Sequence, residues 1–124
     1  AKENNIKLGI ITNGPSKHQW SKVEALGIER WINKDNIVVS GDYDINKPDV
    51  RIFEIMKEKL QLPNDSLYYV GDSLENDIVG ANNAGWKAIW INRYKRKLPG
   101  NVKIYKIAEN NIELFEIIKK IFEK

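Results

Sequence analysis

One stretch of the sequence decides the fold: LYYVGDSLEND, residues 67–77. Its four apolar residues, 67–70, predict a short buried strand. The strand runs into Gly71-Asp72-Ser73, where a helix begins that continues through Ala84 and stops at Gly85. A strand that leads directly into a helix is the repeating unit of a parallel α/β sheet.

The same alternation of strand and helix continues on both sides of this stretch. Apolar runs predict further strands at residues 6–12, 37–39 and 87–91, and a short edge strand at residues 104–107. Strands separated by helices pair in parallel through right-handed crossovers, and active sites then lie beyond the carboxyl ends of the strands. We therefore expect a Rossmann-like α/β domain with three layers, formed by residues 1–124 as a single unit.

Capping and spacing signals predict the helices. Ser16 is the expected cap of a helix that ends at Gly27, and Pro48 suits the first turn of the next helix. Asn110 and Glu113 resemble a capping box for the last helix. The expected buried faces are Trp20, Val23 and Leu26; then Ile52, Phe53, Met56 and Leu60; then Leu114, Phe115, Ile118, Ile121 and Phe122.

Composition excludes several classes of protein. There are no cysteines, so disulfides and thiolate chemistry are absent, which fits a cytoplasmic protein. No long apolar run is present that would span a membrane. The formal net charge of +3 is mild and the charges are interspersed, so we expect no nucleic-acid partner.

Three polar clusters stand at or near the expected carboxyl ends of strands. Thr12-Asn13-Gly14 suits either a phosphate site, with its hydroxyl and free backbone N–H groups, or a plain turn. Lys47 at a loop-to-helix junction could neutralise phosphate charge or lie in solvent. Asp72 and Asp77 could together hold Mg²⁺, or they could only favour the positive end of the helix.

Taken together and in this order, the clusters resemble the haloacid dehalogenase superfamily. Residues 10–14 (IITNG) look like its second motif, residues 47–49 (KPD) like its third, and residues 71–77 (GDSLEND) like its fourth. The resemblance implies that Thr12, Asn13 and Gly14 bind a phosphoryl group and that Lys47 bridges this group and a nucleophilic carboxylate. It further implies that Asp72 ligates Mg²⁺, with Asp77 supporting the metal site and Lys47. The implied reaction is hydrolysis of a small phosphomonoester through an aspartyl-phosphate.

The family's first motif has no counterpart among residues 1–124. That motif is an apolar strand ending in Asp-x-Asp, which lies between the Thr12 strand and the Asp72 strand. We therefore expect an incomplete sheet, and a chain that is inactive alone although its parent is an enzyme. We also expect it to be completed by an N-terminal segment or by oligomerisation, because unpaired buried backbone groups are costly. Asp42 and Asp44 also form an Asp-x-Asp, but they lie between the second and third motifs, and we interpret them as an acidic loop.

Other readings remain open. The chain could be a non-catalytic phosphate-binding or regulatory module, a fragment without an independent role, or part of a mutase or dehalogenase of the same superfamily. His18 is interpreted as a surface residue. The basic run Arg93-Tyr94-Lys95-Arg96-Lys97 is interpreted as a solvated loop, which could also steer anionic substrates.

Overall fold

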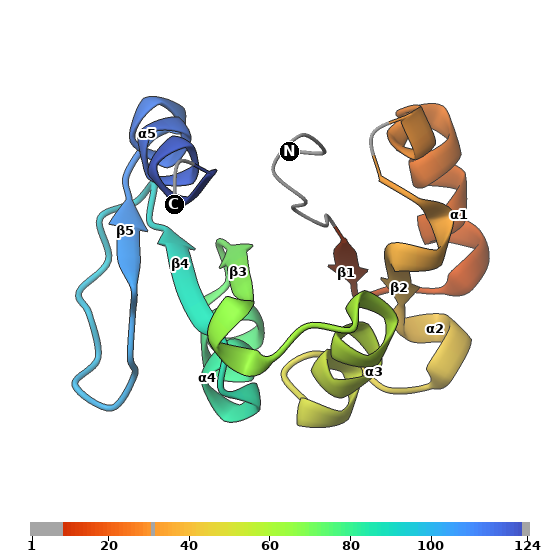
Figure 1. The fold of residues 1–124 in the computed structure, drawn as a ribbon, viewed down its shortest axis with the longest axis horizontal. Coiled ribbons are helices and arrows are strands. Elements are labelled where there is room, and N and C mark those ends of the chain that lie inside the picture. The colour runs from red at the N-terminus through yellow and green to blue at the C-terminus, as the bar shows by residue number, and fades with distance from the viewer. Residues whose placement is uncertain (1–8, 31, 123–124) are drawn as a thin grey trace.

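The computed structural model describes residues 9–30 and 32–122, and all of its strand pairs are parallel. The strands fall into two sheets rather than one: β1 pairs with β2, and β3, β4 and β5 pair in that order. Figure 1 shows the two sheets apart, with β1 and β3 as the strands that face each other. The strands are β1 Ile10–Thr12, β2 Ile37–Val39, β3 Tyr68–Gly71, β4 Lys87–Ile91 and β5 Lys106–Ala108.

Helices connect and cover these strands. The α-helices are α1 Ser16–Ala25, α2 Ser40–Tyr43, α3 Val50–Leu60, α4 Val79–Ala84 and α5 Asn111–Phe122. Short 3₁₀ turns occupy η2 Ile28–Arg30, η3 Lys34–Asn36 and η4 Asn64–Ser66, and the π-helical turn η5 Leu74–Ile78 follows β3. None of the described helices is long and apolar enough to cross a membrane.

The side chains of β2 show how the layers form. Val38 packs into the core beneath the sheets with α3, whereas Ile37 and Val39 pack with Val23 of α1 on the other face. This alternation is the period of two expected for a strand with both faces covered. The arrangement is therefore the predicted Rossmann-like one, with an incomplete sheet.

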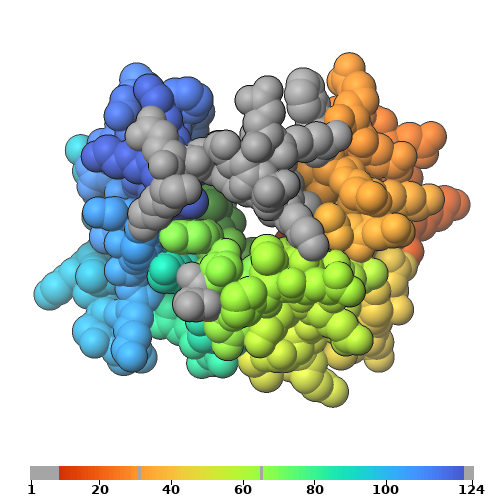
Figure 2. All heavy atoms as spheres, viewed as in Figure 1, coloured from red at the N-terminus to blue at the C-terminus, as the bar shows by residue number. Residues whose placement is uncertain are grey.

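One core extends beneath both sheets. Ile11 of β1 and Phe53 of α3 belong to the same buried cluster as Trp90 of β4. Phe53 lies against Trp86 with ring centroids 5.4 Å apart, edge to face. Helix α3 therefore joins the two parts of the molecule, and its side chains form a continuous surface between them in Figure 2.

Several local expectations were wrong. Ser16 is the first residue of α1 and caps nothing, because Pro15 occupies the N-cap and the Ser16 hydroxyl hydrogen-bonds Asp42 instead. Leu26 is 68% exposed because it follows the last helical residue and lies off the buried face. Pro48 precedes α3, whose N-cap is Asp49.

The C-terminal elements also differ from expectation. The edge strand is β5, which begins two residues later and ends one residue later than predicted. The predicted strand at residues 6–12 is seen as β1, and residues 6–8 lie outside the described part. Glu113 donates its backbone N–H to the Asn110 side chain at 2.8 Å, as in the expected capping box. The predicted buried face of α5 was wrong at Phe115, which is 66% exposed, whereas Leu114, Ile118 and Ile121 are half-buried. The side chain of Phe122 lies outside the description.

Candidate active site

Lys47 and Asp77 form a buried ion pair, although they are thirty residues apart. The Lys47 Nζ lies 2.7 Å from Asp77 Oδ1, and the two side chains are only 12% and 7% exposed. Lys47 comes from the loop before α3, and Asp77 comes from η5, one turn after the end of β3. The fold therefore brings together Lys47 and the cluster of Asp72 and Asp77, which are separate polar clusters in the sequence.

Tyr69 is a third member of this group that sequence reasoning missed. Lys47 Nζ donates to the Tyr69 hydroxyl at 3.1 Å, and that hydroxyl donates to the Ile11 carbonyl oxygen at 3.2 Å. Burial, followed by the charge of Asp77, raises the pKa of Tyr69, so the phenol stays protonated. The available signal was weak: a tyrosine within an apolar strand most often serves the core, and Tyr69 does pack edge to face on Phe53 at 5.1 Å.

Asn13 fastens the end of β1 to Lys47. Its Oδ1 accepts the Lys47 backbone N–H at 2.9 Å, and its Nδ2 donates to the Lys47 carbonyl oxygen at 3.2 Å. The Asn13 amide thus uses its oxygen and one of its two N–H groups within the protein. The second N–H of the amide is what the Asn13 side chain can still offer a phosphate.

Thr12 and Gly14 have internal partners too. Gln19 donates its side-chain amide to the Thr12 hydroxyl oxygen, which leaves the hydroxyl hydrogen free to donate. The Gly14 N–H donates to the Ser40 hydroxyl at 2.8 Å. Of the predicted phosphate-binding groups, the Thr12 hydroxyl and the third N–H of the Lys47 ammonium therefore keep a donor, whereas the Gly14 N–H does not.

The turn after β3 is shaped around Asp77. The Ser73 backbone N–H donates to Asp77 Oδ2 at 3.1 Å, and the Ser73 hydroxyl accepts the Asn76 N–H at 3.1 Å. A Cβ on Gly71 would overlap the Asp77 side chain, so the close approach requires glycine at this position. Both carboxylate oxygens of Asp77 are therefore already hydrogen-bonded.

Asp72 is exposed, because β3 ends one residue before it. Its backbone oxygen accepts the Trp90 indole N–H at 3.2 Å, and its carboxylate has no hydrogen bond to another described residue. Asp72 therefore supplies one free carboxylate at the end of β3.

The donor set fits a Mg²⁺ ion only in part. Among the described residues, no three Asp, Glu or His side chains converge as a complete site would require. Mg²⁺ prefers oxygen ligands and keeps several waters, so the Asp72 carboxylate suits it as one ligand. Asp77 has both oxygens bonded within the protein, to Lys47 and to the Ser73 N–H.

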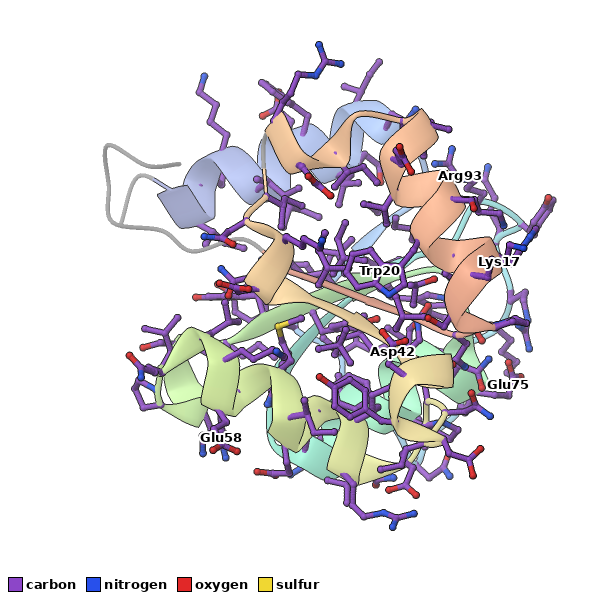
Figure 3. The ribbon with its side chains drawn as sticks, turned by 90° about the vertical axis from the view of Figure 1, so that its right-hand side faces the viewer. Lys17, Trp20, Asp42, Glu58, Glu75 and Arg93 are labelled. Carbon is purple, nitrogen blue, oxygen red and sulfur yellow. The ribbon has the colours of Figure 1, made fainter. Side chains whose placement is uncertain are left out.

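Asp42 and Asp44 belong to a different neighbourhood. Asp42 lies in the short helix α2, not in the acidic loop we expected, and its Oδ2 accepts the Trp20 indole N–H at 2.8 Å (Figure 3). The Ser16 hydroxyl, and then Trp20, hold the pKa of Asp42 below its ordinary value. Asp44 follows α2 in a left-handed conformation and is exposed.

The sequence matches a family model of haloacid dehalogenase-like hydrolases over residues 1–91. The chain belongs to this family. It is 36% identical over 99 residues to pyrimidine 5'-nucleotidase YjjG of Escherichia coli, which covers 79% of this chain and 43% of that relative. It is 36% identical over 91 residues to glyceraldehyde 3-phosphate phosphatase of Methanothermobacter thermautotrophicus, which covers 73% of this chain and 39% of that relative. This haloacid dehalogenase-like chain thus spans about two fifths of the length of these relatives.

Solved structures of the family agree with the fold. The HAD-hydrolase YfnB of Bacillus subtilis, solved with magnesium bound, superposes with a TM-score of 0.83 at 26% identity, over 94% of this chain and 51% of that one. A HAD phosphatase of Thermococcus onnurineus gives a TM-score of 0.78 at 30% identity, over 94% and 52%. Both matches extend beyond the family model to the C-terminal part of the chain.

Proposed function

We propose that this chain forms part of the core of a Mg²⁺-dependent phosphomonoester hydrolase that works through an aspartyl-phosphate. The observation that carries the proposal is the buried Lys47–Asp77 ion pair, fastened through Asn13 to the end of β1 and flanked by the free carboxylate of Asp72. The phosphatases among the relatives support the same reaction. We place the protein in the cytoplasm, in keeping with its lack of cysteine.

The residues would divide the work as follows. The Thr12 hydroxyl, the second amide N–H of Asn13 and the remaining Lys47 N–H would hold the phosphoryl oxygens, because each keeps a donor. Asp72 would hold Mg²⁺, which when bound offsets phosphoryl charge. Asp77 would hold the Lys47 ammonium in place through their ion pair.

The nucleophilic aspartate would come from a strand that inserts between β1 and β3. Among the described residues, no ladder of backbone hydrogen bonds joins the two sheets, so the facing edges of β1 and β3 can each accept a neighbour. A strand at that position would end beside Lys47. The substrate would be a small phosphorylated molecule, and the 124-residue chain alone would be inactive.

Hydrolysis of p-nitrophenyl phosphate tests the proposal. The chain alone should show no turnover, whereas a polypeptide in which a segment bearing Asp-x-Asp precedes residue 1 should show turnover that EDTA abolishes. In that longer polypeptide, Asp72→Asn should abolish hydrolysis. Asp42→Asn should leave the rate of hydrolysis unchanged, because the Asp42 carboxylate bonds Trp20, away from Lys47. Turnover by the chain alone that survives Asp72→Asn would overturn the assignment.

A second function is favoured by one observation. Among the described residues, Lys47 pairs with the carboxylate of Asp77 alone, and both oxygens of that carboxylate are already hydrogen-bonded, so it is not free to act as a nucleophile. The chain would then be a phosphate-binding module without catalysis. Phosphate binding by the longer polypeptide, without turnover of any phosphomonoester, would select this alternative. Phosphoryl transfer between two positions of a sugar, or release of halide, would instead select a mutase or a dehalogenase.

A further inference from the structure

A basic loop follows β4 and is not used by the proposed chemistry. Within residues 93–97 it carries four cations: Arg93, Lys95, Arg96 and Lys97. Arg93 donates to the Asn111 side chain at 2.8 Å, and Arg96 pairs with Glu75 at 3.3 Å. Lys95 and Lys97 are exposed and form no ion pair with another described residue. The loop therefore presents two uncompensated ammonium groups.

The loop is built as a defined turn. Asn92 is buried, and its side chain bonds both backbone groups of Arg96, accepting the N–H at 2.9 Å and donating to the carbonyl oxygen at 2.9 Å. The Asn92 N–H donates to the Ala108 carbonyl oxygen at 2.7 Å, which ties the turn to β5. Lys95 takes a left-handed conformation with φ of 53°. A turn fixed in this way loses little conformational entropy when it binds a ligand.

The loop lies beside Asp72 at the same edge of the sheet. Gly71 of β3 is in register with Trp90 of β4, so Asp72 and the start of the loop leave neighbouring strands together. Trp90 also bonds the Asp72 carbonyl oxygen, and Arg96 reaches Glu75 on η5. The loop stands on the β4 side of Asp72, whereas Thr12 and Lys47 stand on the β1 side.

We propose that this loop binds a second anionic group of the substrate, through Lys95 and Lys97. The inference rests on the proposed function and narrows its substrate class to small molecules that carry a phosphoryl group and also a second phosphate or a carboxylate. A nucleic-acid strand fits less well, because the exposed carboxylates of Asp72 and Glu75 adjoin the loop and the net charge of the chain is only +3.

A matched pair of sugars tests the proposal on the 124-residue chain. Binding of fructose 6-phosphate and of fructose 1,6-bisphosphate is measured by NMR titration at low ionic strength. The bisphosphate should bind about tenfold more tightly, with the largest shifts in residues 93–97, because two added ion pairs of ordinary surface strength give roughly that ratio. Lys95→Gln/Lys97→Gln should bring the two affinities together. Lys119→Gln/Lys120→Gln, which removes two exposed charges from α5, should leave the ratio unchanged.

Several results would overturn the proposal: equal affinities for the two sugars, no detectable binding of the bisphosphate at millimolar concentration, or the same loss in the α5 control. Tighter binding of single-stranded dT20 than of the bisphosphate, lost in the loop variant, would instead make the loop a polyanion surface. Circular dichroism verifies that each variant is folded. The hydrolysis test uses p-nitrophenyl phosphate, which has no second anionic group, so its failure and the failure of this binding test are distinguishable.

Discussion

At the scale of single residues, the Lys47–Asp77 pair couples stability to the proposed site. Asp77 is buried with one donor on each of its two oxygens, Lys47 Nζ on Oδ1 and the Ser73 N–H on Oδ2. The Lys47 ammonium also donates to the Tyr69 hydroxyl. A buried charge that loses its partner is costly, whereas a pair removed together is not. The pair is therefore a sensitive reporter of how well this part of the molecule is packed.

Asp77→Asn should destabilise the chain by about 3 kcal/mol or more, because Lys47 is left buried without a countercharge. Urea unfolding followed by circular dichroism measures the change. The double variant Lys47→Met/Asp77→Leu should recover much of the loss. Removing Glu75, whose pair with Arg96 is exposed, should have a far smaller effect. A loss from Asp77→Asn no larger than that from Glu75→Gln would contradict the buried pair.

Residue identities at the site were partly predictable. Thr12, Asn13, Lys47, Asp72 and Asp77 were named from their order and their resemblance to a family. What the sequence could not indicate was how donors are shared. A side chain that bonds the backbone of a distant residue, as Asn13 does with Lys47, looks the same in sequence as one that is free to bind a ligand.

At the scale of elements, the residue that caps the N-terminus of helix α3, Asp49, also forms an ion pair with Arg51. Asp49 accepts the Arg51 N–H at 2.9 Å and pairs with the Arg51 guanidinium at 2.7 Å. The hydrogen bond from the Arg51 side chain, and then that from its backbone, lower the pKa of Asp49 from 3.8 to about 2. Since the folded pKa lies below the unfolded one, the stabilisation is present above pH 3.8 and is lost as the pH falls toward 2.

NMR titration of the Asp49 carboxyl should therefore give a midpoint near pH 2. In Arg51→Met the midpoint should rise toward 3.8, though not fully, because the backbone hydrogen bond remains. In Asp49→Asn, which keeps a capping side chain, the acid dependence of unfolding between pH 3.8 and 2 should be weaker than in the parent chain. A midpoint near 3.8 in the parent would refute the pairing.

Helices α3 and α4 meet at Gly80, where a Cβ would overlap the Phe53 ring. Gly80→Ala should cost about 1–3 kcal/mol, because Phe53 is buried between Tyr69 and Trp86 and cannot move aside freely. Gly100→Ala is the matched control, since a Cβ there meets nothing within 4 Å. Thermal unfolding compares the two; equal melting temperatures would show that the helices tolerate the added methyl group.

The elements themselves were more predictable than their ends. Apolar runs predicted β2 and β4 at their observed bounds, because a strand buried on both faces leaves an uninterrupted signal. The predicted cap at Ser16 was wrong because a serine near a helix end can also bond a tertiary partner, here Asp42. The predicted place of Pro48 in the first turn of α3 was wrong because Asp49 caps that helix. Phe115 was wrong because helical spacing alone does not show how wide the covered face of α5 is.

At the scale of the whole molecule, the alternation of strand and helix predicted parallel pairing, and the resemblance predicted a missing central strand. The structure has both features: two parallel sheets on one core, with β1 and β3 at the facing edges. Composition and periodicity could not have predicted that the strands divide into two sheets between β1 and β3, because neither shows which strands are neighbours. Val70 of β3 is 38% exposed, as expected for a strand whose neighbour is lacking on one side.

Amide hydrogen exchange should show directly that β1 and β3 lack a neighbouring strand on their facing sides. β4 is paired on both sides, with β3 and β5, so its amides should exchange slowest within the chain. β1 and β3 are each paired on one side, so their amides that point toward the gap should exchange orders of magnitude faster. Placing a segment that bears an Asp-x-Asp strand ahead of residue 1 should slow those amides specifically, while the amides of β5, which lies at the far edge, should change little. Protection of β1 and β3 equal to that of β4 in the chain alone would mean that the two edges already have a partner, for example in a dimer, and its dependence on protein concentration would identify that case.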